Sequence, residues 1–423
     1  MAETKNNKNK KESKKEQEKK KKIIIISMVL IIIICLVVIY CVDDNFHNFV
    51  NETIASILAP EEPDHPDNPD NPDNPDNPDN PDNPDNPDNP DNPSTKTNEP
   101  QVFTGKVTEA FSIHFIAATN DKAGDAIYIK AGDYDILIDA GPIQSSSADI
   151  SAYMDQYITD GKLEFAIATH ADKDHIAGFV GTQASPGIFE RYECETIIDF
   201  PLSDKTTTLY KNYKTKRDAE VALGAKHYTA LQCYNNEDGA QRVYDLGNNV
   251  TMEILYNYYY ENHSPDENNY SVCLLFTENN HKYLLTGDLE KEGEKYLVEY
   301  NNQLTAVDLF KAGHHGSPTS SSLTLLDIIQ PKLCVVTCCA GTDEYTKTDA
   351  NQFPSQAFVD NIYKYTDQVF VTNQIDEETK YKPMNGTIIV ASQSGEDIHV
   401  YCTNSVTLLK DTDWFKAHRT LGE

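Results

Sequence analysis

The sequence predicts a layered α/β domain with two packed sheets over residues 101–423, preceded by one transmembrane helix and a disordered stalk. Two observations predict the domain: short apolar or alternating runs typical of strands recur along it, and segments with helical periodicity lie between several of them. A third observation sets the first hundred residues apart, because their composition cannot form a packed core.

The chain begins with a basic tail, residues 1–22, whose ten Lys and four Glu give a formal charge of +6. Residues 23–42 carry no charge and are long enough to cross a hydrocarbon core of about 30 Å. The positive-inside rule places the tail in the cytoplasm and everything after residue 42 on the other side. A cleaved signal peptide would have a shorter apolar core and a small-residue cleavage site. We therefore expect an uncleaved, single-pass anchor in the cell membrane and an extracellular domain.

An acidic linker is predicted over residues 43–100, and residues 66–92 within it are nine repeats of Pro-Asp-Asn. Proline at every third position fixes φ and removes a backbone donor, so neither helix nor sheet can form. Such a segment extends as a semi-rigid spacer of about 3.1 Å per residue. We expect a stalk that holds the domain away from the bilayer.

The elements of the domain follow from hydrophobic periodicity. Strands are predicted at 107–118, 126–130, 134–138, 164–169, 195–200, 250–257, 271–277, 282–286, 305–311, 333–338, 368–372, 386–392 and 397–402. Helices are predicted near 147–158, 206–222, 289–301, 321–329 and 355–366.

The charge and the cysteines restrict the class of protein. From residue 101 onward the chain has 25 basic and 47 acidic side chains, a formal charge of −22. So acidic a domain repels phosphate backbones, which argues against a protein that coats DNA, although bound metal ions would still permit a nuclease. Cys35 and Cys41 lie in the apolar segment, and the other seven of the nine cysteines lie mostly in strand-like runs. We expect those seven to be buried thiols rather than a disulfide framework.

One segment concentrates metal-binding side chains. The strand that ends near residue 169 leads into a loop with four candidate ligands within six residues, just before a helix-like run: His170, Asp172, Asp174 and His175. Imidazole and carboxylate crowded into one loop are costly unless a cation compensates them. Mixed nitrogen and oxygen ligands suit zinc, manganese or iron rather than calcium.

Three other apolar strands end in polar residues of the same kinds. Asp139 follows the strand at 134–138, Asp288 follows the strand at 282–286, and the pair His314 and His315 follows the strand at 305–311. An Asp beside Gly can simply belong to a turn. Functional sites of α/β sheets nevertheless collect at the carboxyl ends of strands, so we expect these residues to meet. Asp139 would then lie behind the ligand loop and orient it.

The order of these motifs resembles the metallo-β-lactamase superfamily. Ile-Asp-Ala-Gly, His-x-Asp-x-Asp-His, Thr-Gly-Asp and His-His-Gly-Ser occur in that order, and they most resemble the hydrolase domain of ComEC-type competence proteins. The resemblance covers roughly residues 107–395 and implies a four-layer αββα sandwich with a metal site at one edge of its two sheets. The implied ligands are His170, Asp172, Asp174, His175, Asp288 and one of His314 or His315.

The sequence departs from the family pattern at one ligand. The middle histidine of many members has no clear counterpart, because only His227 and His263 lie between residues 180 and 280. The resemblance implies one or two divalent ions, zinc or alternatively manganese. Asp174 or Asp288 would bridge two ions, and the unliganded histidine of the 314/315 pair, or Ser317, would assist the substrate.

The function that these features predict is a membrane-anchored, metal-dependent hydrolase. A metal-activated water would cleave phosphodiesters of nucleic acid or of a cell-envelope polymer. Hydrolysis of a lactone, thioester or β-lactam is an alternative, because the same site can perform it. A non-catalytic surface binding protein on the same fold is another. No feature of the sequence points to an obligate protein partner.

Overall fold

The structure is a computed structural model and describes residues 99–392 and 397–422. The predicted basic tail, transmembrane helix and Pro-Asp-Asn repeats lie outside the described residues. Within the described ranges, none of the helices is both long enough and apolar enough to cross a bilayer.

The first sheet has nine strands in the spatial order β1-β17-β16-β2-β3-β4-β5-β6-β7, and β4 to β7 run parallel to one another. In chain order its strands are β1 (Gln101–Val102), β2 (Phe111–Phe115), β3 (Ile127–Ala131), β4 (Tyr134–Ile138), β5 (Lys162–Ile167), β6 (Glu193–Asp199), β7 (Lys226–Thr229), β16 (Ile388–Ser392) and β17 (His399–Cys402).

The second sheet has eight strands in the order β15-β14-β13-β12-β11-β10-β9-β8, and β11 to β14 are its parallel part. Its strands are β8 (Val243–Asp245), β9 (Val250–Ile254), β10 (Leu274–Glu278), β11 (His281–Leu285), β12 (Leu309–Lys311), β13 (Leu333–Ala340), β14 (Val369–Asp376) and β15 (Lys380–Pro383).

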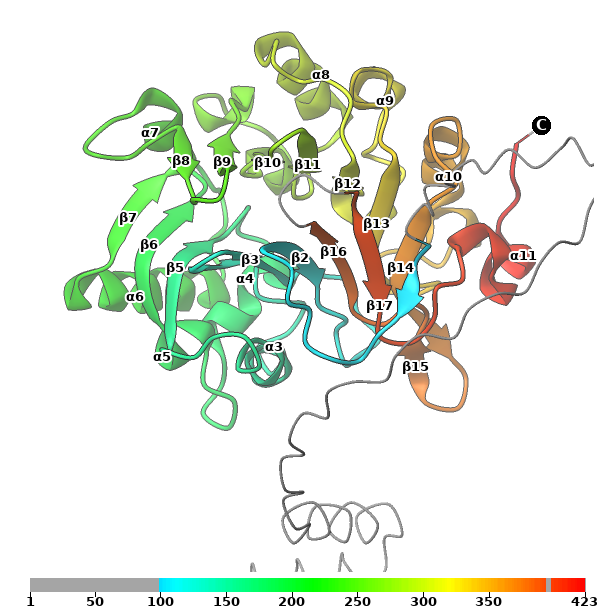
Figure 1. The fold of residues 1–423 in the computed structure, drawn as a ribbon, viewed down its shortest axis with the longest axis horizontal. Helices are drawn as coiled ribbons and strands as arrows, with labels where there is room; N and C mark the ends of the chain where they lie inside the picture. The colour runs from blue at the N-terminus through cyan, green and yellow to red at the C-terminus, as the bar shows by residue number, and fades with distance from the viewer. Residues whose placement is uncertain (1–98, 393–396, 423) are drawn as a thin grey trace, which may run out of the picture. The chain divides into compact units, whose positions relative to one another are not determined.

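The helices lie outside the pair of sheets. Figure 1 shows α8 and α9 at the top of the view and α3 and α5 at the bottom, with the strands between them. The α-helices are α3 (Ser146–Met154), α4 (Lys173–Val180), α5 (Ile188–Arg191), α6 (Thr208–Leu223), α7 (Ala230–Asn235), α8 (Lys291–Tyr300), α9 (Leu323–Ile329), α10 (Gln356–Ile362) and α11 (Asp413–His418).

The side chains of β10 point alternately to the two faces of its sheet, and this shows how the layers form. Leu274 and Phe276 belong to the large core cluster that contains residues of both sheets, whereas Leu275 belongs to the cluster beneath α8, α9 and α10. Successive side chains of a strand point to opposite faces, so one apolar run serves both layers. Burial of each such side chain contributes about 1.5–3 kcal/mol. The result is a mixed α/β fold rich in sheet, as predicted.

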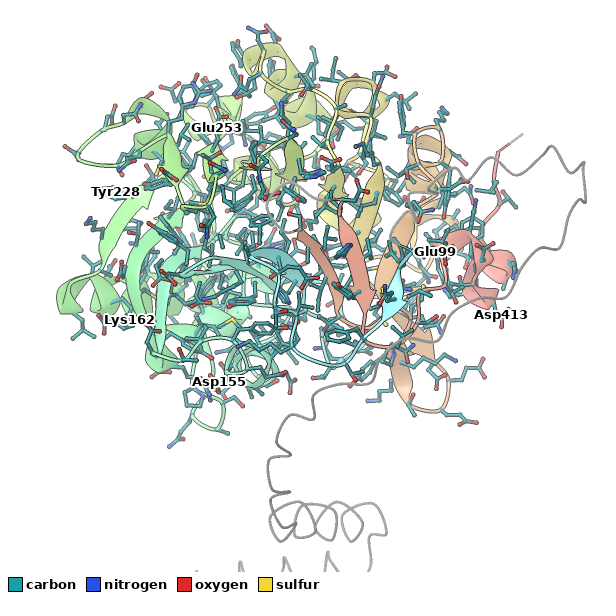
Figure 2. The ribbon with its side chains drawn as sticks, in the orientation of Figure 1. Glu99, Asp155, Lys162, Tyr228, Glu253 and Asp413 are labelled. Carbon is teal, nitrogen blue, oxygen red and sulfur yellow. The ribbon has the colours of Figure 1, made fainter. Side chains whose placement is uncertain are left out.

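The topology brings the carboxyl ends of two parallel sets of strands to one edge, where the predicted site residues lie. Surface ion pairs lie away from this edge. At the amino end of β5, Lys162 Nζ lies 3.0 Å from Glu193 Oε1. Asp155, just after α3, accepts a 2.9 Å hydrogen bond from Arg191. Figure 2 labels Lys162 and Asp155, which lie near the outer ends of β5 and α3.

The predicted strands and helices agree with the structure apart from their ends and a few short elements. The sequence did not predict β7, β8 or β15, which are strands of three or four residues with partly exposed side chains. Three or four residues are too few for alternating apolar side chains to distinguish a strand from a loop. It also did not predict the two-residue strand β1 or the helices α5, α7 and α11, which have four to six residues. The prediction of buried thiols is confirmed, because all seven cysteines of the described domain are free and buried.

Gly178 allows α4 to approach the end of β4. A Cβ added at Gly178 would lie 1.9 Å from the Ala140 carbonyl oxygen, so helix and strand would have to separate. We expect Gly178→Ala to lower the free energy of unfolding by about 3 kcal/mol, at the upper end of overpacking costs. Urea unfolding measures this loss. Gly422→Ala is the control, because a methyl group there meets no atom within 4 Å. Equal stability of both variants would contradict the prediction.

Candidate metal centre

Four side chains from both sheets converge at the shared edge. Asp174 and His175 lie in the first turn of α4, Asp288 follows β11, and His315 lies in the 3₁₀ turn Gly313–Gly316 after β12. One ligand atom from each lies within 4.8 Å of all the others. His175 Nε2 is 3.1 Å and His315 Nε2 is 3.2 Å from Asp288 Oδ2, and His315 Nε2 is 3.5 Å from Asp174 Oδ2.

His175 is held from behind by Asp139, the residue after β4. Asp139 Oδ2 lies 2.7 Å from His175 Nδ1, which leaves Nε2 to face Asp288. Asp139 also accepts hydrogen bonds from the backbone and the hydroxyl of Thr169, at 2.8 Å and 2.7 Å. A carboxylate behind a histidine fixes the orientation and tautomer of the ring in metal sites. Asp139 therefore lies directly behind His175 and fixes the direction of its ring.

A buried lysine that the sequence analysis did not select completes the centre. Lys311, the last residue of β12, is fully buried, and its Nζ lies 2.7 Å from Asp125 Oδ2 and 3.3 Å from Asp288 Oδ1. It also donates a 3.0 Å hydrogen bond to the Gly287 carbonyl oxygen. Lys311 thus holds one oxygen of Asp288, and the other oxygen faces the imidazoles.

Asp125, just before β3, is the second residue that the sequence analysis left out. Its carboxylate accepts a hydrogen bond from the Thr337 hydroxyl and lies 3.4 Å from His315 Nδ1. Asp125 therefore stands behind His315 as Asp139 stands behind His175. A sequence signal existed for both missed residues: Gly-Asp precedes an apolar strand at Asp125, and Lys311 interrupts an apolar strand.

Two buried nitrogens test whether these residues fit a metal ion. Among the residues that the structure describes, His170 Nε2 and His315 Nε2 are buried side-chain atoms without a hydrogen-bond partner. Buried polar atoms are almost always satisfied, and His315 Nε2 faces the carboxylates of Asp288 and Asp174, so this nitrogen indicates a position for a cation. Two imidazoles and two carboxylates form a ligand set that suits zinc or manganese. The residues therefore fit a divalent ion.

The remaining predicted ligands lie at the margin of this group. His170 Nε2 is 3.7 Å from Asp172 Oδ2, and Asp172 pairs through its other oxygen with Lys205. His314 Nε2 is 3.9 Å from Asp288 Oδ2. Of the two neighbouring histidines, His315 joins the central group and His314 lies at its rim.

An aromatic wall borders the centre. The Tyr345 hydroxyl donates a 2.6 Å hydrogen bond to Asp174 Oδ2, and its ring stacks on Phe353 at 5.3 Å between centroids. Phe353 in turn contacts the rings of His314 and His315, at 5.6 Å and 6.2 Å. Burial and the Asp174 charge raise the pKa of Tyr345 far above its ordinary value, so the hydroxyl remains a donor.

The electrostatics of the centre are dominated by mutual pairing. Burial lowers the pKa of His175 and His315, but the facing carboxylates outweigh burial and raise both pKa values well above the ordinary range. Burial raises the pKa of Asp288, but His175, His315 and Lys311 outweigh it and hold that pKa far below its usual value. Without metal, protons on the two imidazoles therefore balance the carboxylates.

Metal binding should consequently release protons. A divalent ion binds neutral imidazole, so at pH 7 we expect roughly two protons to leave His175 and His315 per ion bound. The affinity then rises with pH. In the metal-free protein the same pairs stabilise the fold below the ordinary histidine pKa of about 6.5, and this stability is lost as the pH rises through the raised folded values. Calorimetry in buffers of different ionisation enthalpy counts the protons, and a count of zero would contradict the expectation.

No protein-family model matches the chain. Two curated proteins match it in sequence. The chain resembles ComE operon protein 3 of Bacillus subtilis (strain 168). The two are 27% identical over 236 residues, which are 54% of this chain and 26% of that protein. Recombination protein 2 of Haemophilus influenzae is 26% identical over 103 residues, 24% of this chain and 12% of that protein. The chain thus spans 26% and 12% of the lengths of these relatives.

Solved structures that are similar to this chain include one described as a metallo-β-lactamase fold protein. YhfI from Bacillus subtilis has a TM-score of 0.29 and 15% identity, and the match covers 48% of this chain and 71% of the YhfI chain. Zinc-bound PqqB from Methylobacterium extorquens has a TM-score of 0.31 and 11% identity, and the match covers 54% of this chain and 89% of the PqqB chain. The sequence match to ComE operon protein 3 agrees with the resemblance that the sequence motifs predict.

Proposed function

We propose that this chain is a metal-dependent phosphodiesterase. The observation that carries the proposal is the buried group of Asp174, His175, Asp288 and His315, whose ligand atoms lie within 4.8 Å of one another. Nucleic acid and cell-envelope phosphodiesters are the substrate classes, and the formal charge of −22 from residue 101 onward favours an envelope or small substrate over long DNA.

The proposal places the enzyme at the cell membrane. The uncharged segment at residues 23–42, behind a tail of charge +6, supports a single-pass anchor with the hydrolase domain on the outer side. The nine Pro-Asp-Asn repeats support a spacer that lets the domain reach envelope polymers. Both segments lie outside the described residues, so the support comes from the sequence.

The side chains of the centre have different roles in the proposed reaction. Asp174, His175, Asp288 and His315 would hold a divalent ion, which would supply a Lewis acid to polarise a phosphoryl oxygen and to lower the pKa of a water molecule. Asp139 keeps His175 Nε2 directed at the centre, and Lys311 keeps Asp288 Oδ2 directed there. Tyr345, 50% exposed, donates a hydrogen bond from its hydroxyl to Asp174 Oδ2. His314 lies at the rim, 3.9 Å from Asp288 Oδ2, and we expect it to contact the substrate.

Hydrolysis of a chromogenic phosphodiester tests the proposal. We expect the full chain, loaded with manganese or zinc, to turn the substrate over, and Asp174→Ala to lose this activity. Asp376→Asn, a carboxylate on the β14–β15 hairpin that pairs with Lys382, is the matched control and should remain active. Metal-loaded protein that leaves phosphodiesters intact would refute the proposal. Turnover of lactones, thioesters or β-lactams by that protein would identify carbon-centred hydrolysis, and no turnover at all would favour a binding role.

A further inference from the structure

The His170 side of the centre offers too few ligands for an ion of its own. His170 and Asp172 lie next to each other, 3.7 Å apart between Nε2 and Oδ2, whereas a bound transition metal takes three or four protein ligands. The two histidines between residues 180 and 280 do not supply the third. His227 Nε2 lies 2.8 Å from Asp199 in β6, and His263 Nε2 lies 2.8 Å from Asp204, with its side chain 71% exposed.

A lysine stands at this position instead. Lys205, in the loop between β6 and α6, forms an ion pair with Asp172 Oδ1. The loop is fixed, because the Lys205 backbone donates to Ser203 Oγ at 3.1 Å and the Asp204 backbone donates to Glu267 Oε2 at 3.3 Å. The Lys205 ammonium is therefore a held charge and not a freely moving surface group.

The ammonium also faces outward. The Lys205 side chain is 31% exposed and Asp172 is 28% exposed, whereas His170 beneath them is fully buried. A lysine ammonium has three donors, and Asp172 Oδ1 takes one. The remaining donors can reach an anionic group that enters the mouth of the site. A second divalent ion beside Lys205 would meet a like charge, with one carboxylate already neutralised.

We propose that the Lys205 ammonium takes the place of a second metal ion. It neutralises Asp172, limits the centre to one ion held by Asp174, His175, Asp288 and His315, and binds an anionic oxygen of the substrate. This inference rests on the proposed function in one respect, because a phosphodiester supplies the anionic oxygen. The number of ions and the binding of an anion are both measurable without turnover.

Counting metal ions tests the first half of the inference. The full chain in detergent, saturated with zinc and freed of excess, should contain one ion per chain by elemental analysis. Lys205→His adds an imidazole beside His170 and Asp172, and we expect it to raise the count to two. Lys216→His is the matched control, because Lys216 pairs with Glu190 on the surface and should leave the count at one. Two ions in the unaltered chain, or one ion in Lys205→His, would overturn the inference.

Binding of inorganic phosphate tests the second half. In calorimetric titrations of the zinc-loaded chain, Lys205→Met should weaken phosphate binding about tenfold, a typical loss for one charge-assisted contact. Lys205→Arg keeps the charge and Lys216→Met changes a remote lysine, so both should bind phosphate like the unaltered chain. Equal affinity of Lys205→Met and Lys216→Met would refute the anion contact. A chain that behaves as expected in both assays but cleaves no phosphodiester would refute only the proposed function.

Discussion

Asp288→Asn is expected to reduce metal-dependent turnover by about a thousandfold or more. Asp288 is the only carboxylate of the central group that faces both His175 and His315 through one oxygen. An amide in its place removes the negative charge that would face the ion and that Lys311 contacts at 3.3 Å. Loss of several kcal/mol of transition-state stabilisation corresponds to at least this rate factor.

Steady-state kinetics with a chromogenic phosphodiester and elemental analysis of bound metal measure this effect together. We expect kcat/KM and the metal content to fall in parallel for Asp288→Asn. Asp376→Asn, with its carboxylate on an exposed hairpin, serves as the control for the loss of one charge. Retention of full activity in Asp288→Asn would show that the central group is not the reaction centre.

Lys311→Met is expected to destabilise the metal-free protein by about 3–5 kcal/mol, the usual cost of removing one partner from a buried ion pair. Lys311 is fully buried, and its ammonium contacts Asp125 at 2.7 Å and Asp288 at 3.3 Å. Methionine fills a similar volume but leaves these carboxylates without their cation. Burial already favours the neutral form of Lys311, and the two carboxylates outweigh it, so the pKa rises to about 12.

Urea unfolding of Lys311→Met measures the loss, and a double variant separates charge from packing. Asp125→Asn combined with Lys311→Met removes both members of the closer pair, so we expect it to regain part of the stability. If the double variant were less stable than the single one by the full cost of Asp125→Asn, packing rather than charge would explain the effect of Lys311.

The sequence predicted the fold well where periodicity is strong. Runs such as β4, β11 and β13 are apolar on both faces or alternate clearly, so their positions follow from the sequence alone. The short strand β7 has partly exposed side chains along its length, and only its pairing with β6 makes it a strand. Whether such a short edge segment forms a strand depends on its pairing with a neighbouring strand, and no local sequence pattern shows that pairing.

Some residues of the candidate site could be predicted from the sequence and others could not. Asp174, His175 and Asp288 were predicted because imidazole and carboxylate at strand ends stand out in the sequence, and the structure brings them together. Lys205 and Tyr345 could not be predicted, since each reaches the centre from a distant loop and neither residue type indicates metal chemistry. Which of the two neighbouring histidines joins the central group also depends on backbone geometry. His314 and His315 both have positive φ, 46° and 53°, and this turn directs their rings differently.

Side chains from both sheets meet in one group, so an ion bound there would link the two halves of the domain. His175 comes from the side of the nine-stranded sheet and Asp288 from the eight-stranded sheet, so a cation captured between them ties the halves together. A ligand that binds only the folded protein at a hundred times its Kd adds about 2.7 kcal/mol of stability. Thermal melting in a series of divalent cations would therefore rank the metals by affinity before any substrate is known, and the preferred cation would raise Tm most.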